Sequence, residues 1–130
     1  MKRTALLLAA MAAAAGAPAC ELPPGGQQIA NRDGTLALSY RPDPAPLAID
    51  RPFSLLVHVC SRAPVESLTV DAHMPEHRHG MNYKPGIAPV GVGAWRASGL
   101  LLHMPGKWEF LFGVRVNGKT ERLAHAVLVR

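Results

Sequence analysis

The 130-residue sequence lacks several features that would assign it to a common functional class. Its basic residues are scattered, without the cluster of Lys and Arg that nucleic-acid binding requires, although the formal net charge is +5. It has no Gly-x-Ser-x-Gly motif of the kind that carries a nucleophilic serine. We therefore expect neither a nucleic-acid partner nor a hydrolytic activity. We expect a binding protein that is not an enzyme.

Helix-compatible stretches are also scarce, because the chain contains twelve glycines and twelve prolines. Residues of these types interrupt or end helices, so a helical bundle is excluded. Apolar residues alternate instead with polar or smaller ones, which is the period of a strand with one buried face. The strands expected from this alternation cover residues 36–40, 53–60, 68–74, 95–104, 108–116 and 123–129. The pair Asn117-Gly118 predicts a tight hairpin turn, since both residues tolerate a positive φ. We therefore predict an all-β fold, an immunoglobulin-like β-sandwich of six to eight short antiparallel strands.

The longest apolar run is short and lies near the N-terminus. Lys2 and Arg3 precede eleven apolar residues at 5–15, and small residues stand at 17 and 19. Eleven residues are too few to cross about 30 Å of hydrocarbon, but the arrangement is typical of a secretory signal peptide. We predict that residues 1–19 are such a signal and that the mature protein is exported to the periplasm.

Cysteine is rare, with only Cys20 and Cys60 in the chain. Removal of residues 1–19 would make Cys20 the first residue, which allows acylation of its sulfur and a lipid anchor. In an oxidising compartment the same sulfur can instead form a disulfide with Cys60. The two alternatives exclude each other, and a membrane association is expected only if Cys20 is lipidated. Residues 20–34 are expected to be a flexible segment before a domain at 35–130.

Histidine and methionine occur together in two blocks. The first block, residues 73–81, reads HMPEHRHGM, and the second, residues 103–106, reads HMPG. All three methionines beyond residue 20 lie in these blocks, and His-Met-Pro occurs in both. We expect each tripeptide at the end of a strand, because the residue before proline favours extended backbone. A long loop rich in proline and glycine is predicted between the blocks, over residues 75–93.

A set of imidazole and thioether donors indicates copper. Thioether sulfur favours Cu(I), imidazole binds copper in either oxidation state, and zinc sites seldom use methionine. A blue-copper centre is not expected, because Cys60 has no histidine or methionine close after it. Met74 and Met104 continue apolar faces and so are also candidates for the core, and His125 is expected to be a core histidine. The candidate ligands are His77, His79, Met81, His103, Met104, His73 and Met74.

The same blocks carry a family resemblance. Residues 71–82, Pro85, residues 99–100 and residues 103–109 resemble the YtkA-like domain family, and the pattern is similar to the periplasmic part of FixH-type proteins. The resemblance covers about residues 53–129 and implies an immunoglobulin-like sandwich outside the cytoplasm. It also implies copper handling, with an envelope protein that accepts or donates copper as the partner. The alternative is a β-sandwich module of the cell envelope that binds other proteins without metal.

Overall fold

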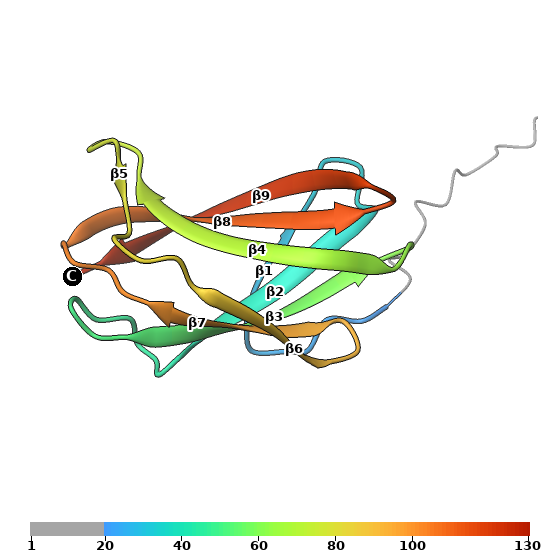
Figure 1. The fold of residues 1–130 in the computed structure, drawn as a ribbon, viewed down its shortest axis with the longest axis horizontal. Helices are drawn as coiled ribbons and strands as arrows, with labels where there is room; N and C mark the ends of the chain where they lie inside the picture. The colour runs from blue at the N-terminus through green and yellow to red at the C-terminus, as the bar shows by residue number, and fades with distance from the viewer. Residues whose placement is uncertain (1–19) are drawn as a thin grey trace, which may run out of the picture.

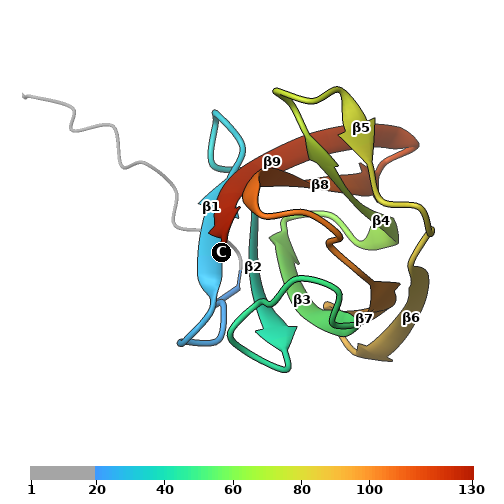
Figure 2. The same ribbon diagram turned by 90° about the vertical axis from the view of Figure 1, so that its left-hand side faces the viewer.

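The computed structural model describes residues 20–130 as two antiparallel β-sheets packed face to face (Figures 1 and 2). One sheet has the strand order β1-β2-β3-β7-β6, and the other has the order β5-β4-β8-β9. The strands are β1 (Gln27–Ala30), β2 (Leu36–Asp43), β3 (Phe53–Ser61), β4 (Val65–Met74), β5 (His79–Gly80), β6 (Gly86–Gly91), β7 (Ala94–Leu100), β8 (Gly106–Val116) and β9 (Lys119–Val129). The predicted signal peptide lies outside the described residues. Within residues 20–130 no helix is long and apolar enough to cross a membrane.

The core lies between the sheets and follows the predicted alternation. Leu55 and Val57 of β3 face Trp108, Phe110 and Phe112 of β8 across the sandwich, and all five side chains are buried. Successive side chains of a strand point to opposite faces, so each alternate apolar residue reaches the core. The prediction of an all-β sandwich is confirmed.

The β8–β9 hairpin turns at the predicted dipeptide. Asn117 and Gly118 have φ values of 52° and 74°, and Val116 pairs with Lys119 on either side of the turn. Residues 113–120 read GVRVNGKT, which also fits the Gly-x4-Gly-Lys-Thr spacing of a phosphate-binding loop. Such a loop needs a helix after it, whereas these residues form two paired strands and their turn. The structure therefore excludes this second interpretation of the motif.

Three short strands were not expected from the sequence. β1 lies in the segment before residue 35 and pairs with β2, while β5 and β6 lie in the predicted loop at 75–93. β6 contains Pro89, which has no N–H to donate, and it is tolerated because β6 lies at the edge of its sheet. Nine strands are thus present in residues 20–130, against the six to eight predicted.

The strand predicted for residues 95–104 ends earlier than expected. β7 stops at Leu100, directly after Gly99, whose φ of 81° is in the left-handed region that interrupts an extended strand. Residues 101–105 then cross the end of the sandwich, where the carbonyl of Leu102 accepts a hydrogen bond of 2.8 Å from the N–H of Asp50. The second His-Met-Pro tripeptide therefore lies in a connection and not at a strand end, so that prediction was wrong.

A disulfide joins Cys20 to Cys60, with their Cα atoms 5.6 Å apart. Cys60 is buried on β3, and Cys20 belongs to the segment that leads into β1. Of the two alternatives considered for Cys20, the structure contains the disulfide. The bond attaches the N-terminal segment to the five-stranded sheet.

Candidate metal centre

The two His-Met-Pro blocks meet at one end of the sandwich, at the left in Figure 1. The first block ends β4 at Met74, turns over residues 75–78 and returns as β5, where His79 pairs with Met74. Arg78 adopts a φ of 53°, which reverses the chain, and the N–H of His77 donates to the carbonyl of Met74 at 3.2 Å. The β7–β8 connection carries His103 across the same end (Figures 1 and 2).

The imidazoles of His79 and His103 stack on each other where the blocks meet. Their ring centroids are 5.2 Å apart, with an angle of 24° between the ring planes. Nε2 of His79 and Nδ1 of His103 are buried, and neither nitrogen has a hydrogen-bond partner among residues 20–130. A buried polar atom without a partner costs about 1–3 kcal/mol, so proteins rarely retain two side by side without a reason.

Trp108 of β8 forms the floor under both imidazoles. Its buried indole lies edge-on to His103 at 5.5 Å and to His79 at 6.4 Å, measured between ring centroids. The indole Nε1–H donates to the carbonyl of Met104 at 2.9 Å, which fixes the connection that carries His103. The sequence analysis did not select Trp108 as a site residue. Its position three residues after Pro105 in the second block was the available signal.

The three candidate methionines have different environments. Met74 is 1% exposed and belongs to the core, as its apolar face allowed. Its methyl group lies 3.0 Å from where a Cβ would stand on Gly106, so the glycine of the second block makes room for it. Met81 and Met104 are only partly buried and pack at the margin of the core. Of the three thioethers, those of Met81 and Met104 are therefore the ones accessible to an ion.

The two other histidines of the first block do not join the buried pair directly. His73 lies on the outer face of β4, where its Nε2 pairs with Oε1 of Glu109 on β8 at 3.0 Å. His77 is exposed in the turn, and its ring stacks on His79 with centroids 6.0 Å apart. The structure thus brings together His77, His79 and His103, whereas His73 lies on the outer face of the sheet.

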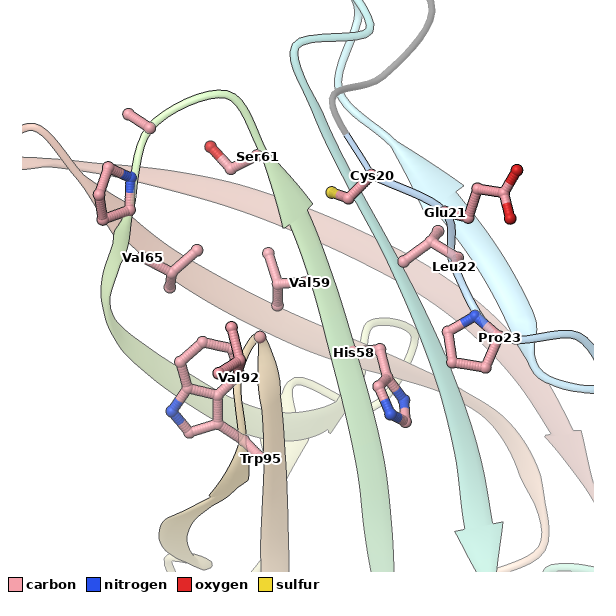
Figure 3. A pocket seen from close by; sticks show the side chains of 13 residues that line it. Cys20, Glu21, Leu22, Pro23, His58, Val59, Ser61, Val65, Val92 and Trp95 are labelled. Carbon is pink, nitrogen blue, oxygen red and sulfur yellow. The ribbon is translucent and has the colours of Figure 1, made fainter.

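The remaining two histidines lie away from this end. His125 of β9 is hydrogen-bonded through Nδ1 to the buried hydroxyl of Tyr40, as expected for a core histidine. His58 lines a largely apolar cavity of about 490 Å³ near the opposite end of the sandwich, together with Leu22, Val92 and Trp95 (Figure 3). That cavity lies far from the His-Met blocks along β3 and β4 and has no part in the site.

The His-Met end offers imidazole nitrogens and thioether sulfurs as donors to a metal ion. Among residues 20–130 no three side chains of His, Cys, Asp or Glu are grouped so that they would hold a metal. The stacked imidazoles of His79 and His103 each have a buried nitrogen without a hydrogen-bond partner in this part of the chain, so the two rings would supply two nitrogen donors. Further donors would then be thioethers, and the partly buried Met81 and Met104 are the candidates within the two blocks. Such a set fits Cu(I) and not the usual zinc site.

Comparisons of the chain with family models, with curated proteins and with solved structures find no match. The resemblance to the YtkA-like family therefore stays a prediction that rests on the residues quoted above. Any function must be argued from the site itself.

Proposed function

We propose that the chain binds copper, preferably as Cu(I), at the His-Met end of the sandwich and carries it to or from another protein of the bacterial envelope. The observation that carries the proposal is the pair of buried, unpartnered nitrogens on the stacked rings of His79 and His103. A bound cation would give both nitrogens the partner that residues 20–130 do not provide. The thioethers of Met81 and Met104 would complete a soft coordination shell.

The chemistry that copper would supply here is binding and release, and no reaction of a further substrate is invoked. Each imidazole must be neutral to donate its lone pair, and the buried indole of Trp108 packs edge-on against both rings. Because the ligands come from two segments, binding would hold the β4–β5 turn against the β7–β8 connection. Export of the chain, its link to the YtkA-like family and transfer to an envelope partner belong to the same proposal.

An anaerobic competition titration with a chromophoric Cu(I) chelator tests the proposal on the purified chain. The double variant Met81→Leu and Met104→Leu keeps side-chain volume and should bind Cu(I) at least about tenfold more weakly, while its affinity for Cu(II) changes less. Met74→Leu is the matched control, because that thioether is in the core. It should leave the Cu(I) affinity unchanged.

A double-mutant cycle then tests whether the two blocks share one ion. His79→Ala and His103→Ala should each weaken Cu(I) binding, and the double variant should lose less than the sum of the two free energies. Additive losses would mean that the blocks bind separate ions. A wild-type chain that binds no copper would refute the proposal and favour the protein-binding alternative.

A further inference from the structure

Three imidazoles form a row from the surface to the buried pair. His77 stacks on His79 at 6.0 Å with 29° between the planes, and His79 stacks on His103 at 5.2 Å with 24°. His77, in the turn between β4 and β5, is exposed, whereas His79 and His103 are partly buried. The other two rings each keep a buried nitrogen without a partner.

From this row we infer that His77 is the transfer ligand of the site, the group that first receives an incoming copper ion and last holds a departing one. The inference rests on the proposed function and goes beyond it, because it separates a ligand that sets the rate from the ligands that set the affinity. His79 and His103 are the resident ligands, and His77 acts at the opening that a partner would face.

Copper exchange by this route needs an exposed donor. A Cu(I) ion held by buried nitrogens would leave most easily if a new bond formed before an old one broke, and a partner's ligands would reach the exposed His77 before the buried nitrogens of His79 and His103. The imidazole of His77 would bond to the ion while one of the resident bonds breaks, and the partner's donor would then replace His77. The ion stays Cu(I) throughout, no electron is transferred, and each neutral imidazole keeps its proton on its other nitrogen.

His73 provides a matched comparison within the same block. It is four residues from His77 and partly exposed, with a side chain 39% exposed, but its imidazole is held by Glu109 on the outer face of the sheet. It stacks on neither resident ring among the ring pairs of residues 20–130. A general effect of removing a surface histidine would appear equally in both variants.

The test compares rates with affinities in the full chain loaded with Cu(I) under anaerobic conditions. Stopped-flow absorbance follows transfer to bicinchoninate, and equilibrium competition with the same chelator measures affinity. In His77→Ala the transfer rate should fall about tenfold while the affinity changes less than about threefold, whereas His73→Ala should change neither. His77→Met should restore most of the rate, because a thioether also binds Cu(I).

Each other outcome overturns the inference. Equal losses of rate and affinity in His77→Ala would make His77 a resident ligand, and an unchanged rate would remove it from the path. Thermal unfolding of the copper-free variants controls for folding, and this exposed turn position should tolerate alanine. Failure of the wild-type chain to bind Cu(I) is a separate result, which refutes the proposed function and this inference with it.

Discussion

Replacing a resident histidine by leucine should leave the copper-free protein at least as stable as the wild type. His79→Leu and His103→Leu each remove a buried nitrogen without a partner, which relieves about 1–3 kcal/mol. Each also loses an edge-on contact with the indole of Trp108, which is a cost of about 0.5–1.5 kcal/mol. The net change is a stabilisation of about 1 kcal/mol, or about 4 °C in Tm for a domain of this size.

His125→Leu is the control with the opposite expected sign. The imidazole of His125 is hydrogen-bonded to Tyr40, and its removal leaves a buried hydroxyl without a partner. That loss costs about 1–3 kcal/mol, so the control and the test variants should differ by about 3 kcal/mol in the free energy of unfolding. All three substitutions remove one imidazole from a partly buried position, and the main difference between them is the hydrogen-bonding state of the ring.

Urea unfolding of the copper-free variants, followed by circular dichroism, measures the difference. A second series with Cu(I) should raise the stability of the wild type and of His125→Leu but raise that of His79→Leu and His103→Leu much less. If His79→Leu and His103→Leu destabilise the copper-free chain as strongly as His125→Leu, then their nitrogens are satisfied in solution. The argument for a metal site from unpartnered nitrogens would then be refuted.

Two further predictions concern the frame that holds the site. Burial raises the pKa of Tyr40 to about 12, so the unfolded chain ionises first and stability should fall by up to about 2 kcal/mol as pH rises from about 10 to about 12. Tyr40→Phe should lack this loss in urea unfolding at about pH 9 and about pH 11.5, and an equal loss in both proteins would contradict the assignment. The disulfide closes a loop across a sequence separation of 40, so Cys20→Ser with Cys60→Ser should destabilise the chain by up to roughly 4 kcal/mol. Urea unfolding with and without a thiol reductant checks this prediction, and a wild-type chain whose stability does not change with the reductant would refute it.

The alternation of apolar residues was sufficient to predict the central strands, because a two-residue period has only one arrangement that buries all of one face. It also contained information about His73 that the sequence analysis did not use. Met74 faces the core, so its neighbour His73 must face outward, and the two cannot serve one site from the same strand. The pairing of His73 with Glu109 depends on the register between β4 and β8, which the sequence does not show.

Connections were harder to predict than strands. Gly99 ends β7 early through a positive φ, and a strand with a single glycine gives no warning of this, since many strands contain one. β5 has only two residues, and it forms because Arg78 reverses the chain beside β4. The position of His79 against His103 depends on both features, so the meeting of the two blocks was predictable in outline but the stacking of the rings was not.

The candidate centre is distinguished by the missing hydrogen-bond partners of its histidines and not by the number of histidines. His73 has a carboxylate partner and His125 has a hydroxyl partner, so each contributes to the fold without any ligand. His79 and His103 each have a buried nitrogen without a partner among residues 20–130, and their rings continue the row that begins at the exposed His77. A structural role would favour leucine or phenylalanine at both positions, because an apolar ring or chain packs on Trp108 without an unmet hydrogen bond. We therefore propose that the two imidazoles hold a ligand that binds nitrogen, and the partly buried thioethers of Met81 and Met104 in the same two blocks would favour copper as that ligand.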